Sequence, residues 1–390
     1  MSAALVTFAN IGRKPNLRTT DMLPILDAFA ARGEPLELIC QIAEGSPYPR
    51  SYPAVPTPLR YALRLAEKLS GRTLSRRASE RLFDIFASRR LTKADVAFLH
   101  GSYFLPRTAA RVHRLGGVTV EISVSAEMGA NARLEREELA RLGFPEYRGW
   151  YTALAEEVRA QPPCDYLILM SEFTKRTYLE AGYPADRIFI AHLDVDTERF
   201  SPPTHPDPTA PFRVLYLAYT QPLKGLHYLL DAWESLALPG AELVIAGGFA
   251  DMPAELEAAY RERMGKDPSI RFVGGVSKPE ELYRDASVFV FPSLSEGFGR
   301  SALEAMACGI PVITTEHAAS IVEDGATGFV VPIRDPGAIA DKVRTLYADR
   351  ALAGRMGAAA RRAALEKSSF GEEVFGIYQT ILAREGKLGA

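Results

Sequence analysis

Residues 288–312 read VFVFPSLSEGFGRSALEAMACGIPV, a stretch that combines a strand, a loop and a helix. A buried apolar strand is expected to end at Phe291, and a helix of small and apolar residues is expected over Ser301–Cys308. In the loop between them, Gly297 and Gly299 would let the backbone approach a ligand without hindrance from side chains. The first amide groups of the helix would then face an anion along the helix dipole. The stretch therefore predicts a site for a diphosphate.

Two glutamates of this stretch carry further chemistry. Glu304 lies about one turn into the expected helix, where Arg300 is the only cation within four positions. A carboxylate buried there without partners would be costly, and the hydroxyls of a ribose could satisfy it. Glu296 begins the loop and would lie on the other side of the phosphates, close to a sugar ring. In the alternative interpretation, Glu304 is an exposed helix residue and Glu296 an ordinary loop acid.

Outward from this stretch, short apolar runs alternate with segments of helical period, which is typical of βαβ units around a parallel sheet. The expected strands are Ala4–Ala9, Leu36–Ile42, Val96–His100, Val118–Ile122, Tyr166–Met170 and Ile188–Ala191 in the first half, and Arg213–Leu217, Glu242–Ala246, Ile270–Val273, Val288–Phe291 and Val312–Thr314 in the second. Further helices are expected over Gly225–Leu236, over Pro336–Tyr347 and from about Ala351 onward.

A proline-rich run, SPPTHPDPTAP, separates the two halves just before Phe212. It can neither pair in a sheet nor propagate a helix, so it marks an interdomain linker. We therefore expect an α/β fold with one Rossmann-like domain over residues 1–205 and a second over residues 206–365. The remaining segment, residues 366–390, is expected to be helical and could pack back on the N-terminal domain.

Composition excludes several classes of protein. The chain has 390 residues and a formal net charge of −2, so no global charge attracts nucleic acid. Its three cysteines, Cys40, Cys164 and Cys308, are widely spaced and have no metal-site spacing, which favours reduced thiols. The N-terminus lacks the features of a signal peptide, and no apolar run approaches the ~20 residues of a membrane-spanning helix. These observations predict a cytoplasmic protein.

Glu296 and Glu304, with seven residues between them in the context EGFG and LEAMA, resemble the signature of retaining glycosyltransferases of family 4. The resemblance continues from the SEFT that begins at Ser171, through VDTERF at Val195, to DGATGFVVP at Asp324, and covers most of residues 165–348. It implies the GT-B architecture, in which two facing Rossmann-like domains with parallel sheets enclose a cleft. The N-terminal domain would bind the acceptor, and the C-terminal domain would bind a nucleotide-sugar donor.

The resemblance also implies roles for single residues. Glu304 would bind the ribose hydroxyls, Glu296 would hold hydroxyls of the transferred sugar, and Lys224 would neutralise the leaving diphosphate. The remaining phosphate contacts would come from the loop and helix start, namely Gly297, Phe298, Gly299, Arg300 and Ser301. A cation and preorganised amides lower the barrier to departure of a diphosphate, so neither a metal nor another cofactor is expected. Alternatively, Lys224 is a surface residue beside a helix start.

The sequence departs from the family pattern at several positions. Ala218-Tyr219 stands where the family has Gly-Arg, so the arginine expected at the diphosphate is missing. Residues 316–320, EHAAS, replace a Gly-Gly…Glu segment, and Glu121 lies at the strand end where the family often has a histidine. An Asp-x-Asp pattern, the type that can hold a divalent ion, occurs at Asp194, but it lies next to a hinge-like turn.

Three residues of the first strand-to-helix loop, Gly12, Arg13 and Lys14, offer a replacement for the missing arginine. In this architecture the loop faces the cleft, so its positive charge could reach the diphosphate and compensate for Tyr219. In the alternative interpretation, the segment is an ordinary solvated basic loop.

The segment from Leu59 to Lys93 is unusually basic for a slightly acidic protein. Its cations are Arg60, Arg64, Lys68, Arg72, Arg76, Arg77, Arg81, Arg89, Arg90 and Lys93, and its acids are Glu67, Glu80 and Asp84. Such a helical segment could lie on an anionic leaflet, each cation contributing ~1 kcal/mol. A peripheral contact of residues Arg60–Lys93 with the inner face of a membrane would suit a lipid-linked acceptor, whereas the alternative is a solvated pair of basic helices.

Together these features predict a retaining, metal-independent transfer of a hexose from a nucleotide sugar to a hydroxyl acceptor. The expected process is the synthesis of a polysaccharide, a glycolipid or another glycoconjugate, and the acceptor a glycan or a lipid-linked sugar. Two alternatives remain open: a non-catalytic glycosyltransferase-like partner that binds sugar or nucleotide, and a disaccharide phosphorylase on the same fold.

Overall fold

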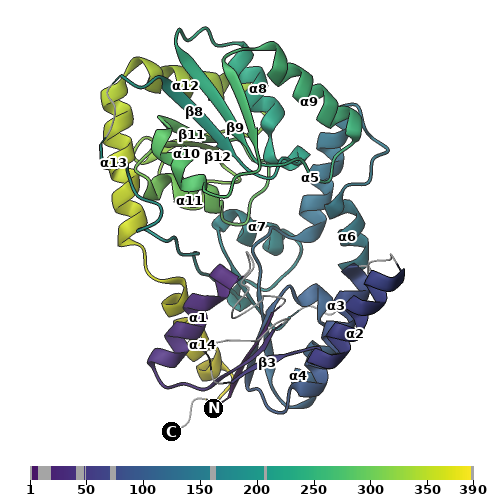
Figure 1. Ribbon diagram of the computed structural model, residues 1–390. Helices are drawn as coiled ribbons and strands as arrows, with labels where there is room; N and C mark the ends of the chain where they lie inside the picture. The colour runs from purple at the N-terminus through teal and green to yellow at the C-terminus, as the bar shows by residue number, and fades with distance from the viewer. Residues whose placement is uncertain are drawn as a thin grey trace.

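Two parallel sheets, one in each half of the chain, form the framework of the protein (Figure 1). The computed structural model describes residues 2–7, 19–40, 48, 50–70, 76–158, 164–205 and 209–387. The N-terminal sheet has seven strands in the order β3-β2-β1-β4-β5-β6-β7, and the C-terminal sheet has six in the order β10-β9-β8-β11-β12-β13. All strand pairings described in both sheets are parallel.

The N-terminal sheet is covered by helices on both faces. Its strands are β1 (Ala3–Thr7), β2 (Leu36–Cys40), β3 (Ser51–Pro53), β4 (Val96–His100), β5 (Val118–Ile122), β6 (Tyr166–Leu169) and β7 (Ile188–Ile190). Its helices are α1 (Thr19–Ala31), α2 (Thr57–Ser70), α3 (Arg76–Arg90), α4 (Pro106–Arg114), α5 (Met128–Arg141), α6 (Trp150–Val158) and α7 (Glu172–Glu180). Successive residues of β1 enter different apolar clusters: Leu5 enters one, and its neighbours Ala4 and Val6 enter another. Strands buried on both faces in this way read as continuous apolar runs.

The C-terminal sheet places β8 and β11 side by side at its centre. Its strands are β8 (Phe212–Leu217), β9 (Ala241–Ala246), β10 (Ile270–Gly274), β11 (Val288–Phe291), β12 (Val312–Thr315) and β13 (Gly328–Val331). Its helices are α8 (Leu226–Glu234), α9 (Ala254–Lys266), α10 (Pro279–Asp285), α11 (Arg300–Ala307) and α12 (Pro336–Ala348). The strand order reverses between β8 and β11, and in such sheets the loops diverging from that point leave a crevice for a ligand.

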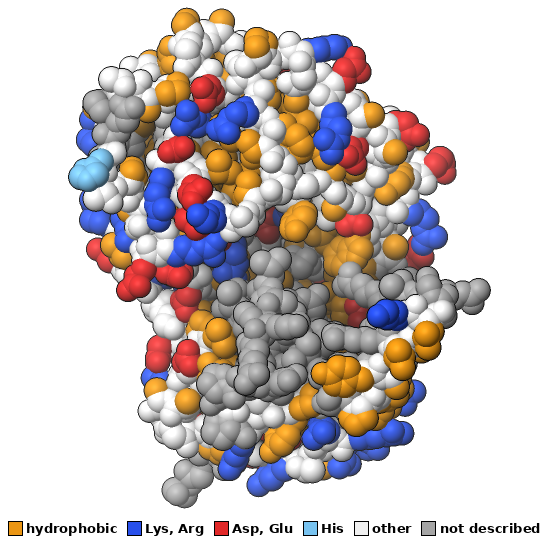
Figure 2. Space-filling model, in the orientation of Figure 1, with side chains coloured by type: hydrophobic (Ala, Val, Ile, Leu, Met, Phe, Trp, Pro, Cys, Tyr) orange, Lys and Arg blue, Asp and Glu red, His pale blue; other side chains and the backbone are white. Residues whose placement is uncertain are grey.

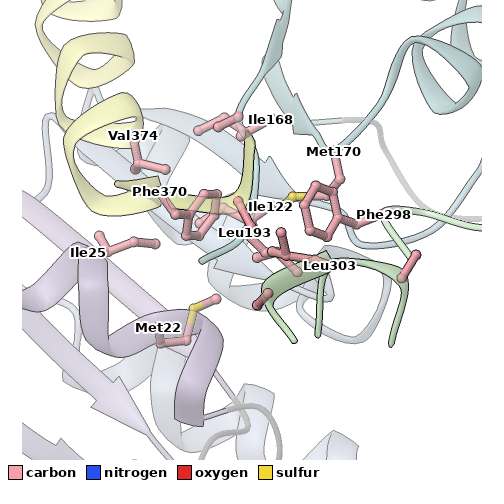
Figure 3. Packing of buried hydrophobic residues seen from close by; sticks show 14 of the residues in the cluster. Met22, Ile25, Ile122, Ile168, Met170, Leu193, Phe298, Leu303, Phe370 and Val374 are labelled. Carbon is pink, nitrogen blue, oxygen red and sulfur yellow. The ribbon is translucent and has the colours of Figure 1, made fainter. Parts of the chain in front are cut away.

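The last two helices connect the domains on one side of the molecule. Helix α13 (Arg350–Glu366) packs against α11, whereas α14 (Phe370–Arg384) packs against α1. One apolar cluster therefore contains residues of both domains, and in Figure 3 Phe370 of α14 lies between Met22 and Ile25 of α1 on one side and Leu193 on the other. No helix of the described chain is both long and apolar enough to cross a membrane.

Every strand predicted from the sequence is observed, with ends that differ by no more than one residue where the chain is described. Two strands were not predicted. β3 is only three residues long and ends in Pro53, which suits its position at the sheet edge. β13 begins at Gly328, where a Cβ atom would lie 2.0 Å from the carbonyl oxygen of Val312. The glycine is required by close approach of two strands, and it interrupts the apolar pattern.

Candidate active site

The loops that follow β8 and β11 are joined to each other at the central crevice of the C-terminal sheet. After β8, a 3-10 turn (η3, Pro222–Lys224) leads into Gly225, whose φ is 70°. A Cβ atom on Gly225 would lie 2.0 Å from the carbonyl oxygen of Pro292, so the two loops touch backbone to backbone. The amide of Leu294 also donates to the carbonyl oxygen of Leu223 at 2.8 Å. These contacts fix the position of Lys224 relative to the loop of β11.

Lys224 and Glu296 form an ion pair across this junction. Their side chains are 18% and 17% exposed, respectively, and the Lys224 ammonium also lies 5.6 Å from the centroid of the Phe291 ring. The structure thus brings together two residues that the sequence predicted to meet the leaving phosphate and the sugar. A charge pair at this degree of burial acts more strongly on a ligand than it would in bulk water.

Helix α11 begins directly behind this pair. Gly299 is its N-cap residue with φ 79°, in the left-handed region that favours glycine. The backbone carbonyl of Phe298 accepts a hydrogen bond from Ser320, and the Phe298 ring is buried beside Met170 and Leu193 (Figure 3). The half-buried side chains of Arg300 and Ser301 occupy the first turn. Since the first amides of a helix lack partners within it, this turn can receive an anion.

Glu304 lies in the middle of α11 and is partly buried. Burial raises the pKa of its carboxyl, and this effect outweighs the opposing hydrogen bond from Tyr283 and the charge of Arg300. The Tyr283 hydroxyl, on α10, donates to Glu304 at 3.0 Å. Burial also lowers the pKa of Arg300. A carboxylate offers about four acceptor positions, so Glu304 can hold a diol in addition to the tyrosine.

The remaining predicted site residues are distributed differently. Tyr219, just beyond β8, is 65% exposed. Gly12, Arg13 and Lys14 lie outside the described residues. Glu121 is buried in β5, where its charge contributes, after burial itself, to raising the pKa of Tyr178 on α7. The position where the family often has a histidine is thus occupied here by a buried carboxylate.

The Asp-x-Asp pattern at the hinge has structural roles. Asp194 accepts from the amide of Phe370 at 2.8 Å, at the start of α14. Asp196 accepts from the amides of Glu198 and Arg199 at 3.1 and 3.0 Å. Both carboxylates therefore hold backbone amides, Asp194 at the start of α14 and Asp196 within its own turn.

Residues 316–320, where the sequence departs from the family pattern, are hydrogen-bonded to the loop that follows β11. Nδ1 of His317 lies 2.8 Å from the carbonyl oxygen of Leu294. Because a carbonyl oxygen can only accept, Nδ1 carries the proton and donates it. The His317 ring stacks on Phe173 of α7 at 4.2 Å between centroids, and burial lowers its pKa. Ser320 holds Phe298, as described above. Sequence reasoning missed His317, whose role depends on a partner in the other domain.

A cavity of about 560 Å³ lies between the domains beside this segment. Its walls come from the ends of β6 and β7, from Glu296, from residues 316–320 and from Glu373 of α14. Glu296 thus faces both the β8–β11 crevice and a space bounded by the N-terminal domain.

Helix α5 of the N-terminal domain is seated on the C-terminal domain, a contact that no sequence motif announced. The Glu138 side chain is fully buried and accepts hydrogen bonds from Nε2 of His227 at 2.7 Å, the Tyr228 hydroxyl at 2.6 Å and Nε of Arg334 at 2.9 Å. Burial alone would raise the pKa of Glu138, but these three partners outweigh it and hold the pKa below its ordinary value. Leu142, directly after α5, packs against the apolar core of the C-terminal domain.

Comparison with known proteins gives a family match for the C-terminal domain. Residues 211–349 match the family model described as glycosyl transferases group 1. That range contains Lys224, Glu296 and Glu304. Together with the solved structures described below, the two parallel sheets confirm the α/β GT-B fold class predicted from the sequence, and residues 211–349 are similar to the group 1 glycosyl transferases.

Two curated relatives are similar to part of this chain. The capsular polysaccharide biosynthesis glycosyltransferase CapM of Staphylococcus aureus is 34% identical over 172 residues, which are 42% of this chain and 45% of CapM. A D-inositol 3-phosphate glycosyltransferase of Xylanimonas cellulosilytica is 31% identical over 263 residues, 60% of each chain. The matches therefore span about half of the length of these curated relatives.

Solved structures resemble the whole chain. Anabaena HepE in complex with UDP and glucose has a TM-score of 0.66 at 14% identity and covers 98% of this chain and 100% of its own. Sucrose-phosphate synthase from Thermosynechococcus elongatus has a TM-score of 0.69 at 19% identity, covering 98% and 99%. At these identities the likeness shows the fold.

Proposed function

We propose that the protein is a retaining, metal-independent hexosyltransferase of family 4 that moves a hexose from a nucleotide sugar to a hydroxyl acceptor. The observation that carries the proposal is the Lys224–Glu296 ion pair at the start of α11, with Glu304 further along the same helix. These groups match three parts of a nucleotide sugar: a cation for the diphosphate, a carboxylate for the sugar hydroxyls and a second carboxylate for the ribose.

The proposed chemistry follows from these positions. The bond between the anomeric carbon and the diphosphate oxygen breaks, and negative charge develops on that oxygen. Lys224 and the first amides of α11 stabilise the charge, which is where preorganised donors lower a barrier most. The acceptor oxygen bonds to the anomeric carbon on the face the diphosphate leaves, and the acceptor proton passes to a phosphate oxygen. No group in this scheme requires a divalent ion.

The relatives suggest a donor and a process for this chemistry. HepE binds UDP and glucose, and CapM acts in capsular polysaccharide biosynthesis. We therefore propose a UDP-hexose as the first donor to test and a growing polysaccharide or glycoconjugate as the acceptor.

Helices α2 and α3 support a membrane-bound acceptor. On α2, Tyr61, Leu65 and Leu69 recur every four residues and are 57%, 57% and 79% exposed, with the exposed Lys68 alongside. Figure 2 shows hydrophobic and basic side chains next to one another over this part of the molecule. An apolar stripe flanked by cations suits the interface of an anionic membrane.

On α3 the described acidic side chains are buried and the described basic ones are exposed, which also suits an anionic membrane surface. Glu80 and Asp84 are buried, and Asp84 accepts from the amides of Arg107 and Thr108 at 2.9 Å each. Three arginines of this helix, Arg81, Arg89 and Arg90, are exposed, as is Lys93. The side chains of Arg60, Arg64, Arg76 and Arg77, and the whole of Arg72, lie outside the described residues. The described acids thus leave the outward face of α3 to cations, and we propose a peripheral contact with an anionic leaflet.

Vesicle sedimentation tests the membrane contact. The protein should pellet with vesicles that contain phosphatidylglycerol and stay in the supernatant with pure phosphatidylcholine. Leu65→Gln combined with Leu69→Gln should release most of the bound protein. Leu179→Gln, which alters a 38% exposed leucine of α7, is the matched control and should not. Equal release by the control would contradict the role of α2.

Incubation with UDP-, GDP- and ADP-hexoses tests the enzymatic proposal. Slow hydrolysis of one donor, unaffected by EDTA, is the expected result, and retention of anomeric configuration should be visible by NMR. Nucleotide binding without hydrolysis would instead indicate a non-catalytic partner. Sugar release that requires phosphate and no nucleotide would indicate a phosphorylase. Loss of turnover in EDTA with recovery in magnesium would contradict the metal-independent scheme.

A further inference from the structure

One buried side-chain amide joins the two domains at the loop between β11 and α11, residues 292–299, which we call the donor loop. Asn131, near the start of α5, is 1% exposed. Its Oδ1 accepts from the hydroxyl of Ser295 at 2.5 Å, across the domain interface. Its Nδ2 donates to the hydroxyl of Ser125 at 2.9 Å and to the carbonyl oxygen of Ala126 at 3.1 Å. The loop after β5 and the loop after β11 are thereby tied through one side chain.

Both chain neighbours of Glu296 contact the N-terminal domain. Ser295 is held by Asn131. On the other side, a Cβ atom on Gly297 would lie 1.8 Å from the carbonyl oxygen of Val124, so the two backbones are in direct contact. The residues on either side of Glu296, Ser295 and Gly297, are therefore both fixed to the other domain, while the Glu296 carboxylate pairs with Lys224.

A tyrosine of the N-terminal domain also interacts electrostatically with the carboxylate. Burial raises the pKa of Tyr151, on α6, and the negative charge of Glu296 raises it further. Tyr151 in turn is placed by Glu135, which accepts from the amides of Tyr151 and Thr152 at 3.2 and 2.7 Å. Because Glu135 and Asn131 lie one turn apart on α5, the same helix positions both Ser295 and Tyr151.

Helix α5 is itself fixed to the C-terminal domain. Glu138, two turns after Asn131, is buried among three partners of α8 and the β13–α12 loop. A residue on such a helix cannot shift alone, so the distance between Asn131 and Ser295 is set by the docking of the whole helix. The donor loop thus takes its position from a long rigid contact.

We propose that Asn131 is a positioning residue for Glu296, and that seating of α5 on the C-terminal domain aims the Glu296 carboxylate at the transferred sugar. The inference rests on the proposed function and adds an interdomain control of its site. Loss of the bond to Ser295 releases the residue before Glu296 from the N-terminal domain. A displacement of about 1 Å at a reacting centre can lower turnover about 10²-fold, while the ribose site at Glu304 and Tyr283 is untouched.

Three variants test the proposal: Asn131→Ala, Ser295→Ala and the double variant. Each should lower kcat of donor hydrolysis by about 10- to 100-fold and leave the Kd of the nucleoside diphosphate unchanged. The double variant should be no worse than Asn131→Ala alone, because Asn131→Ala already removes the contact with Ser295. Hydrogen exchange at the amides of residues 293–301 should accelerate in each.

Thr108→Ala is the control for general loss of stability. Thr108 is fully buried and its hydroxyl donates to Asp84 at 2.8 Å, within the N-terminal domain. This variant should keep wild-type kcat and wild-type exchange at residues 293–301. The same loss in Thr108→Ala as in Asn131→Ala would overturn the positioning role, and so would wild-type kcat in Asn131→Ala.

The exchange measurement separates this proposal from the proposed function. If the wild-type protein turned over no donor at all, the enzymatic proposal would fail, yet accelerated exchange at residues 293–301 in Asn131→Ala would still support the tie between α5 and the loop. Unchanged exchange in Asn131→Ala would overturn it whatever the activity.

Discussion

The two domains supply the candidate site in different ways. In the C-terminal domain, Glu296 and Glu304 belong to one strand–loop–helix unit, and Lys224 comes from the loop of the adjacent strand. In the N-terminal domain, the contributing side chains form no motif, and Asn131 reaches a partner 164 residues away in the sequence. The residues of the proposed donor site are thus encoded locally, whereas the placement of the donor loop depends on how the domains meet.

The domains also differ in how they hold charge. The Lys224–Glu296 pair is partly exposed, whereas the Glu138 carboxylate at the interface is fully buried and its partner Arg334 is 18% exposed. Breaking a buried pair leaves an uncompensated charge and is strongly destabilising, so the interface charge fixes a geometry. The pair in the crevice remains available to a ligand. Variants in each region should therefore affect different measurements.

Lys224→Ala should have the largest effect on turnover. It removes the cation that we expect to meet the leaving diphosphate, and loss of such a group costs about 10²–10³ in kcat. Steady-state kinetics with the preferred donor measures the change. Lys266→Ala, which alters an exposed lysine paired with Glu262 on α9, is the control and should leave kcat unchanged. A wild-type kcat in Lys224→Ala would remove the central element of the local site.

Glu304→Ala should lower nucleotide affinity rather than the rate of the chemical step. Charge-assisted bonds to two hydroxyls are lost, which corresponds to about 10²-fold in Kd. Calorimetry with the nucleoside diphosphate measures it. Tyr283→Phe removes only the 3.0 Å bond to Glu304 and should have a smaller effect in the same direction. If both variants bound nucleotide normally, the ribose would have to lie elsewhere.

The fold could be predicted well because its signals are local. Buried parallel strands are short apolar runs, and the ends of Val96–His100, Val118–Ile122 and Val288–Phe291 were predicted to the residue. The residues of the proposed donor site come from a motif in which glycines and carboxylates have fixed spacing. Two strands were missed. β3 is only three residues long, and β13 begins at Gly328, which is required by the close approach of β12 and interrupts the apolar pattern.

Partners across long sequence separations could not be predicted. Tyr283 meets Glu304 from the preceding helix, and nothing in its own sequence context marks it. Asn131 and Ser295 meet across the domain interface although they lie 164 residues apart in the sequence. The spacing of a motif does not specify such contacts between domains.

Two glycines separate a contact within a domain from one between domains. In Gly297→Ala, the added Cβ collides with Val124 of the other domain, which can be relieved by a small opening of the interface. We expect about a tenfold loss of kcat with little change in melting temperature. In Gly225→Ala, the collision is with Pro292 of the same domain and φ is positive, so the melting temperature should fall. Equal melting temperatures would contradict this distinction.

Glu138→Gln should have the smallest effect on turnover and a distinctive dependence on pH. The folded-state pKa of Glu138 is held below the ordinary value of 4.5 by its three hydrogen-bond donors, which outweigh the effect of burial. A carboxyl whose pKa is depressed by folding contributes stability above its unfolded pKa and loses it as the pH falls through the folded pKa. Glutamine does not titrate and carries no charge for Arg334. The melting temperature of the wild type should therefore exceed that of Glu138→Gln by a few degrees near pH 7, and the difference should shrink progressively below pH 4.5.

Glu137→Gln provides the matched control. Its carboxylate is 46% exposed and pairs with the same Arg334 at 3.1 Å, so its melting temperature should fall much less. If the two variants melted alike across this range, the buried carboxylate would not be what fixes α5 on the C-terminal domain, and the placement of the donor loop would have to depend on the apolar contacts at the end of that helix.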